Sequence, residues 1–413
     1  MRYENITKRI LSLVLAVAML VSFLPAVQWA VEAEAVETKA AETKATRKTM
    51  YFSSSEGTSW GSYESFNSIN NPGKLSKASD IAKWLNKGYN VMLKRGDIWE
   101  FPTFDDSMTL QGIRGTADSP VVLGAYGEGA DPVIGFLKRI KDNAWTCVDT
   151  ANNIYEADVS NLVLRNGIST HRCFVNDVPY THNLEASTNK DISKLKAGEH
   201  CSFDKKVYVR MASGKPTNVE ATNYNGGHRI FINDVEYLTI ENIHIKGGNA
   251  ISSMIYMDAP TKYLKFDSCK ITHCFYYIMM WETDDENIHY KPEISNCYID
   301  AMFNEAEGAT NNDNKEGTDL AYWNHWSTSR TEGITLRDGV DGAWIHHNTI
   351  RNMSHAFIAI ETLSENTTTD SEGNVTNEGY KTTGVRNCII EDNLLEGGNV
   401  WYARAFNICG GYN

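Results

Sequence analysis

A short phrase recurs along the second half of the chain and constrains the fold more than any other feature. In each copy an apolar residue, here called the anchor, opens a polar run that often holds Asn or Cys. A second apolar residue follows five positions later. The anchors are Ile240, Phe266, Ile294, Ile345 and Ile390, with gaps of 26, 28, 51 and 45 residues. Such repeats bury their apolar face only by stacking, so the phrase predicts a parallel β-solenoid with one continuous core.

Stacking also predicts which distant residues are neighbours. Equivalent residues of successive turns form a column, with one strand spacing of roughly 4.8 Å between them. The first two gaps fit one turn each, and the last two fit one turn plus an inserted loop. The corner of each repeat holds an amide at Asn242, Asn296, Asn348 and Asn393. We expect these amides to form an internal ladder that satisfies buried turn groups.

Composition narrows the class of protein. The chain has 413 residues, of which 42% are hydrophobic, and a net charge of -13. This is enough apolar content for a core, and the acidic balance argues against nucleic acid and anionic membrane as partners. Eight cysteines suit a disulfide framework poorly in a domain of this size. Cys269 and Cys297 are expected to stack as small buried apolar residues, with a disulfide as the alternative.

The N-terminus has the pattern of a secretory signal. Arg2, Lys8 and Arg9 precede an apolar run, and Ala33-Glu-Ala35 offers a cleavage site of small residues. Residues 1–35 are therefore predicted to be a signal peptide, with an uncleaved membrane anchor as the alternative. Residues 36–49 repeat Glu-Thr-Lys-Ala and form a low-complexity linker. The mature chain is expected to be a secreted, extracellular or cell-surface monomer without stable membrane insertion.

The rest of the chain divides into three parts. Residues 50–135 are expected to hold an N-terminal capping helix, over 76–85, and the first turns. Residues 136–228 are interpreted as a β-rich insertion, because short strand candidates alternate there with polar turns. The regular repeats occupy 229–413 and reach the last residue without a capping element, so we expect that the sequence is truncated there. The predicted fold class is all-β.

Three stretches resemble the opening of a known superfamily. They are Lys94-Arg-Gly-Asp-Ile-Trp99, Ser119-Pro-Val-Val-Leu-Gly-Ala-Tyr-Gly127 and Asp131-Pro-Val-Ile134. They are similar to the start of secreted right-handed parallel β-helix proteins of the pectate-lyase-like superfamily. The resemblance covers about 50–135 and 229–413 and rests on structural residues. It implies a right-handed parallel β-helix and polysaccharide substrates, cleaved by hydrolases or by lyases.

The third strand of each turn carries the groove in relatives of this fold, and four polar residues are expected to share its outward face. Glu282 follows Ile271 by eleven residues, and Glu361 follows Ile350 by eleven. Since side chains alternate along a strand, the register predicts one outward column on consecutive turns. Its members are Asp258, Glu282, Arg337 and Glu361.

This column suits acid–base chemistry on a glycosidic bond. Glu282 and Glu361 would lie two strand spacings apart, roughly 9–10 Å, near the separation of inverting glycosidases. Asp258 and Glu282 would lie nearer the separation of retaining enzymes. Arg337 would split the pKa values of its acidic neighbours. The alternative is an exposed ladder in which Arg337 only relieves repulsion between stacked acids.

The largest inserted loop, 303 to about 330, offers sugar contacts. It contains Trp323, His325 and Trp326, and aromatic rings of this kind stack on sugar faces while their polar edges stay wet. With Asp338, these residues are the predicted substrate-binding set. The alternative is a loop that folds onto its own aromatic rings.

No motif for a cofactor or a metal is recognised. Asp284-Asp285-Glu286 is an all-oxygen cluster that leaves Ca²⁺ open, but it has no recognised loop spacing, so we expect no cofactor. The favoured function is an exported glycoside hydrolase. A polysaccharide lyase, with Ca²⁺ or Arg337 neutralising a uronate, is the first alternative. A non-catalytic carbohydrate-binding or cell-surface protein is the second.

Overall fold

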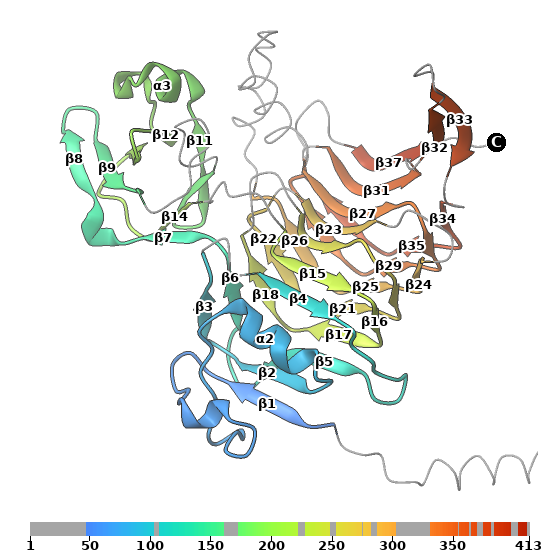
Figure 1. Cartoon of the computed structure of the whole chain (residues 1–413). Helices are drawn as coiled ribbons and strands as arrows, with labels where there is room; N and C mark the ends of the chain where they lie inside the picture. Colours follow the sequence, from blue (N-terminus) through green and yellow to red (C-terminus); the bar gives the residue numbers. More distant parts are fainter. Residues whose placement is uncertain are drawn as a thin grey trace, which may run out of the picture. The chain divides into compact units, whose positions relative to one another are not determined.

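The computed structural model shows a protein built mostly of β-strands in parallel sheets (Figure 1). None of the helices in the described part of the chain has the length and apolar character needed to span a bilayer. The structure describes residues 47–102, 107–160, 172–221, 228–247, 253–274, 276–281, 287–302, 331–353, 355–362, 365–369, 375–380, 384–397 and 404–410.

Four parallel sheets run along the molecule, here called the first, second, third and short sheets. The first sheet holds β1 (Thr49–Phe52), β2 (Asn90–Lys94), β5 (Val121–Tyr126), β17 (Leu238–Glu241), β21 (Lys265–Asp267), β25 (Glu293–Ser295), β29 (Trp344–His346) and β35 (Ile389–Glu391). The second holds β3 (Ile98–Glu100), β6 (Val133–Gly135), β18 (His244–Lys246), β22 (Lys270–Thr272), β26 (Tyr298–Asp300), β30 (Thr349–Arg351) and β36 (Leu394–Glu396).

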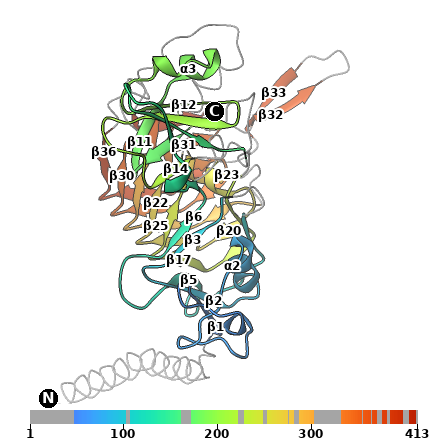
Figure 2. The same ribbon diagram turned by 90° about the vertical axis from the view of Figure 1, so that its left-hand side faces the viewer.

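The other two parallel sheets hold the remaining strands of each repeat. The third sheet holds β4 (Met108–Gln111), β15 (Ile230–Asn233), β19 (Ser253–Met257), β23 (Tyr276–Trp281), β27 (Glu332–Arg337), β31 (Ala356–Thr362) and β37 (Arg404–Gly410). The short sheet holds β16 (Val235–Glu236), β20 (Thr261–Lys262), β24 (His289–Tyr290), β28 (Val340–Asp341) and β34 (Val385–Arg386). From β16 onward, successive repeats add one strand to the short, first, second and third sheets in that order. Figure 2 shows β1, β2, β5 and β17 one above another in chain order.

The register predicted from the repeated phrase is confirmed. Ile240 lies level with Phe266, and the later anchors continue the column through Ile294, Ile345 and Ile390. The second apolar residues of the phrase form a matching column on the second sheet, from Ile245 to Leu395. Most of these side chains are fully buried and belong to the single large core between the sheets.

A sharp corner separates the first sheet from the second. Its first residue has a left-handed backbone in every repeat, with φ between 51° and 57°, at Asn242, Ser268, Asn296, His347 and Asp392. Asn and Asp tolerate this conformation better than most residues with a Cβ. Asn242 and Asn296 therefore form the corner itself, and the predicted amide ladder is wrong for these two of its four members.

The residue after the corner points into the core. This position holds Cys269, Cys297, Asn348 and Asn393, and Asn348 Nδ2 donates to Asn393 Oδ1 at 2.9 Å. Asn348 Oδ1 accepts the backbone N–H of Cys297 at 2.9 Å. Both cysteines are buried, and all eight cysteines of the chain are free, so the prediction of small buried side chains holds.

A short helix and a separate sheet flank the parallel strands. Helix α2 (Ala78–Leu85) buries Ile81 and Leu85 in the large core. The mainly antiparallel sheet holds, in spatial order, β7 (Lys138–Ile140), β14 (Val219–Ala221), β10 (Cys173–Val175), β11 (Val178–His182), β12 (Glu199–Phe203), β13 (Lys206–Arg210), β9 (Ile154–Asp158) and β8 (Thr146–Asp149). It carries helix α3 (Leu184–Asn189) and has small cores of its own.

Polar contacts join this antiparallel sheet to the second sheet. Lys246 on β18 pairs with Asp177 at 2.7 Å and with Glu220. Arg172 donates to the carbonyl oxygens of Ala301 at 2.8 Å and Met302 at 2.7 Å, which directly follow β26. These contacts tie the inserted sheet to the strands that lead toward the third sheet.

Candidate active site

The outward face of the third sheet brings together three of the polar residues predicted for it, Asp258, Arg337 and Glu361. On β27, Leu336 is fully buried in the core, and Arg337 follows it on the outward face. Arg337 lies level with Trp281 on β23 and with Glu361 on β31. Asp258 directly follows Met257, which lies level with Met280 just before Trp281. The column is therefore Asp258, Trp281, Arg337 and Glu361.

The position predicted for Glu282 in this column is wrong. The pairing places Trp281, not Glu282, beside Arg337. Ile271 and Ile350 lie in the same column of the second sheet, yet ten residues separate Ile271 from Trp281 and eleven separate Ile350 from Glu361. The corner before β23 is one residue shorter than the corner before β31. Glu282 itself lies outside the described residues.

Arg337 and Glu361 form an ion pair that is largely screened from water. The Nε of Arg337 donates to Oε2 of Glu361 at 2.8 Å, and Nη2 contacts the same oxygen. Asn407 on β37 donates to the other carboxylate oxygen at 3.0 Å. Glu361 is only 5% exposed. Both oxygens are thus held by donors from the neighbouring strands, which fixes the orientation of the carboxylate and of the guanidinium.

An indole ring completes the other side of Arg337. The guanidinium carbon lies 4.8 Å from the centroid of the Trp281 ring, within the range of a cation–π contact. Tyr256 packs edge-on against Trp281, with centroids 6.4 Å apart. The site therefore presents an aromatic ring, a cation and an anion on three adjacent strands.

A local irregularity brings a second carboxylate to the same face. At the start of β19, Met254 and Ile255 are consecutive yet both are fully buried in the core. The equivalent pair on β27 is Gly333 and Ile334, and a Cβ on Gly333 would meet the core side chains of Ile350 and Met353. Two consecutive inward positions leave Glu332, just before them, on the outward side.

Glu332 is bound by a histidine and a hydroxyl. His355 Nδ1 lies 2.7 Å from Oε1 of Glu332, and the hydroxyl of Thr335 donates to Oε2 at 2.7 Å. Burial alone would raise the pKa of Glu332, but the hydrogen bonds from His355 and Thr335 and the charge of Arg337 outweigh it. The pKa of Glu332 therefore lies below its ordinary value. Because the carboxylate fixes Nδ1 as a donor, Nε2 of His355 is the nitrogen left for proton transfer.

The remaining predicted site residues differ in how exposed they are and in whether the structure describes them. Asp258 is exposed at the end of β19, and its backbone N–H lies 3.4 Å from Asn233 Oδ1. Asp338 is fully buried at a left-handed position, with φ of 54°, and is therefore a poor candidate for direct contact with substrate. Trp323, His325 and Trp326 lie outside the described residues.

Sequence reasoning left out several members of the site. Asn407 lies level with Ala359, two positions before Glu361 and on the same face, so register alone could have placed it near the acid. Thr335 lies level with Met279 on the same outward face. The Glu332–Thr335 contact had no signal in the sequence, because it depends on the irregularity at Gly333.

The described part of the chain offers no preformed metal site. No group of three or more His, Cys, Asp or Glu side chains there is arranged to hold a metal ion. The acidic run Asp284-Asp285-Glu286, which left Ca²⁺ open, lies outside the described residues.

Comparison with known proteins assigns no family. No family model and no curated protein matches the chain. Solved structures resemble it at low identity. "The complex structure of XylC with xylose" is 12% identical with a TM-score of 0.47, over 76% of this chain and 60% of that chain. A GH136 lacto-N-biosidase from Eubacterium ramulus is 17% identical with a TM-score of 0.35, over 81% of this chain and 47% of that chain.

A third neighbour has a different activity in its name. It is an alginate lyase from Paenibacillus, 11% identical with a TM-score of 0.34, over 79% of this chain and 76% of that chain. The chain spans less than two thirds of the length of the first two neighbours. These similarities define neither a family nor an activity for this protein, so its function is argued from its own residues.

Proposed function

We propose that this protein is a secreted carbohydrate-active enzyme, specifically a glycoside hydrolase that acts on a polysaccharide along the outward face of the third sheet. The observation that carries the proposal is the column of Trp281, Arg337 and Glu361. An aromatic ring, a guanidinium and a buried carboxylate converge there on adjacent strands. In this proposal the four parallel sheets are the faces of a right-handed parallel β-helix, and the mature protein is an extracellular monomer.

The chemistry would need two carboxylates on either side of a glycosidic bond. Glu361 supplies one, held by Arg337 and Asn407. Glu282 directly follows Trp281 in the sequence and is the proposed partner, in an order of acid and base that stays open. The alternative pair is Asp258, which follows β19 on the neighbouring strand, with Glu282, at the shorter separation of retaining enzymes. Trp281 offers a surface for a sugar ring, and Trp323, His325 and Trp326 are proposed to extend it.

Isosteric substitutions test this assignment. Glu361→Gln and Glu282→Gln remove an ionisable group while keeping size, so each should lose at least a hundredfold in turnover and still bind glycan. Glu100→Gln, at an exposed glutamate on β3, is the matched control and should retain full turnover. Full turnover in both site variants would overturn the assignment of these two acids.

A specific observation favours a lyase as the second candidate. Glu332 orients His355 on the same face as Arg337, and a histidine of this kind can abstract a proton next to a uronate carboxylate. We place it second because Arg337 is already neutralised by Glu361. A uronate would have to compete with that carboxylate for the guanidinium. His355→Gln should abolish elimination if this candidate is right, and should spare hydrolysis if it is wrong.

A non-catalytic binding protein remains the third alternative. It predicts that a double variant, Glu282→Gln with Glu361→Gln, keeps every measurable function. Measurement of glycan binding and product release by the same double variant separates this alternative from both enzymes.

A further inference from the structure

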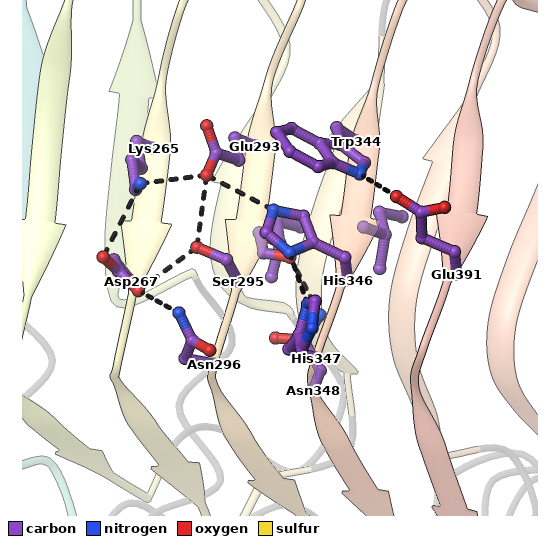
Figure 3. A network of polar contacts seen from close by, with 12 residues as sticks. Lys265, Asp267, Glu293, Ser295, Asn296, Trp344, His346, His347, Asn348 and Glu391 are labelled. Atoms are coloured by element: carbon purple, nitrogen blue, oxygen red, sulfur yellow. Dashed lines mark hydrogen bonds and ion pairs between the residues drawn. The ribbon is translucent and has the colours of Figure 1, made fainter.

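We propose that the outward face of the first sheet, around Trp344, is a second glycan-binding surface that takes neutral sugar chains. Its ligand class rests on the proposed function, but its residues lie on a different sheet from the candidate active site. We call it the Trp344 surface, and it consists of Lys265, Asp267, Glu293, Ser295, Asn296, Trp344, His346 and Glu391 (Figure 3).

Trp344 is exposed and yet held in place. It is 41% exposed, although it is a large apolar side chain on a regular strand. Its Nε1–H donates to Oε1 of Glu391 at 2.9 Å. Its ring stacks on His346 with centroids 3.9 Å apart and planes at 27° (Figure 3). A ring fixed in this way loses little conformational entropy on binding, which favours its use as a platform for a sugar.

Fixed polar groups continue beside the ring across β25 and β21. Lys265 pairs with Glu293 at 2.9 Å, and the same Glu293 oxygen lies 3.4 Å from His346 Nε2. Asp267 accepts from Ser295 at 3.2 Å and from Asn296 at 2.8 Å. Figure 3 shows these groups as one connected network beside Trp344. An aromatic ring with preorganised hydrogen-bonding groups next to it matches the face and the hydroxyls of a sugar.

The charge of the surface selects among glycans. The Trp344 surface holds three carboxylates, Asp267, Glu293 and Glu391, and one lysine, Lys265, which pairs with Asp267 and Glu293. The excess of negative charge repels a polymer that carries a carboxylate on each sugar. Carboxylate oxygens accept hydrogen bonds from neutral hydroxyls, so we infer that neutral glycans are the ligands.

Two surfaces on one molecule would act together on a long chain. Once a polysaccharide is held at the Trp344 surface, its effective concentration at the third sheet rises without any new contact there. The surface would thus retain a polymeric substrate between cleavage events. Short oligosaccharides, which cannot reach both sheets, would gain nothing from it.

Affinity electrophoresis tests the inference without requiring turnover. The probes are three native gels, which contain a neutral galactan, a neutral xylan and alginate. Alginate is the uronate polymer of the three. At least one neutral gel should retard the parent protein, and Trp344→Ala should weaken that association by about tenfold. Trp344→Phe, which keeps a ring, should retain most of the binding. Alginate should retard neither protein.

The control is a second exposed tryptophan. Trp60, in the short helix η1 (Trp60–Ser62), is 69% exposed, and its ring lies beside those of Tyr63 and Phe66. Trp60→Ala should leave retardation unchanged. Equal loss in Trp60→Ala and Trp344→Ala, or no loss in a folded Trp344→Ala, would overturn the inference. If Trp344-dependent binding occurs without any cleavage, the proposed activity fails and the inference about the Trp344 surface stands. If cleavage occurs without Trp344-dependent binding, the proposed activity stands and the inference fails.

Discussion

Arg337 and Glu361 lie level on adjacent strands of the third sheet, and the Nε of Arg337 donates to Oε2 of Glu361 at 2.8 Å. The arginine side chain is 17% exposed and the glutamate side chain 6%. Removing one partner of a buried ion pair leaves the other charge buried without compensation, which lowers the free energy of unfolding by about 3–5 kcal/mol. We therefore expect Glu361→Ala to lower the free energy of unfolding by about 3 kcal/mol in urea denaturation.

An exposed ion pair provides the comparison. Lys190 and Asp204 are 58% and 60% exposed in their side chains, so Asp204→Ala should cost less than about 1 kcal/mol. Equal costs for Glu361→Ala and Asp204→Ala would contradict the burial of the Arg337–Glu361 pair.

The shape of the guanidinium should matter as well as its charge. A lysine at position 337 keeps the charge but loses the planar contact with Trp281 and the second donor to Glu361. Misplaced groups of this kind cost roughly a hundredfold in rate, so Arg337→Lys should lower kcat/KM by about that factor. Arg114→Lys, at an exposed pair with Asp234, is the control in the same kinetic assay. Full activity of Arg337→Lys would remove Arg337 from the proposed site.

The core amide of the fourth repeat, Asn348, should be a major source of stability. Asn348 is 1% exposed; its side chain accepts from the N–H of Cys297 and donates to the carbonyl of Ile294 and to Asn393. Asn348→Ala leaves several buried groups unsatisfied, at about 1 kcal/mol or more each. We expect a total loss of about 3 kcal/mol by urea denaturation.

The control residue is Asn296, which lies one repeat earlier, at the position equivalent to His347, just before Asn348. Asn296 has a left-handed φ of 55°, and its side chain donates to Asp267 at the surface. Asn296→Gly keeps that backbone conformation accessible and should cost under about 1 kcal/mol. A smaller loss in Asn348→Ala than in Asn296→Gly would contradict the ladder.

Buried histidines should make stability depend on pH. Burial lowers the pKa of His289 from 6.5 to about 4, and its Nδ1 lies 3.0 Å from the Thr261 hydroxyl. As the pH falls, the His289 side chain is protonated near pH 6.5 in the unfolded chain but only near pH 4 in the folded chain. The free energy of unfolding therefore falls as the pH drops through this window. His289→Gln should make the slope shallower by about 1.4 kcal/mol per pH unit. An unchanged slope between pH 4.5 and 6.5 would contradict the burial of a neutral ring.

The repeated phrase predicted more of the fold than of the site. The anchors from Ile240 to Ile390 share one column because each must fill the same place in the core, and that requirement is visible in the sequence. The predicted place of Glu282 in the column was wrong because the corner before β23 is one residue shorter than expected. The number of residues in a corner is set by local backbone geometry, which the period of the repeat does not report. Asn242 and Asn296 were mistaken for core amides for the same reason, since one position separates the left-handed corner from the core.

The polar partners at the site were hidden for a different reason. Arg337 and Glu361 were expected on one face, and the structure places them level on it. Their bonding to Asn407 and the pairing of Glu332 with His355 depend on side-chain directions and on two consecutive inward residues at Gly333 and Ile334. A strict alternation rule would have turned Glu332 toward the core.

The most direct test of the proposed activity is a product analysis. The purified mature chain is incubated with neutral and uronate polysaccharides, and the products are read for new reducing ends and for the ultraviolet absorbance of an unsaturated uronate. We predict reducing ends from a neutral polysaccharide without that absorbance. Absorbance rising together with reducing ends would contradict hydrolysis and assign the third-sheet site to a lyase.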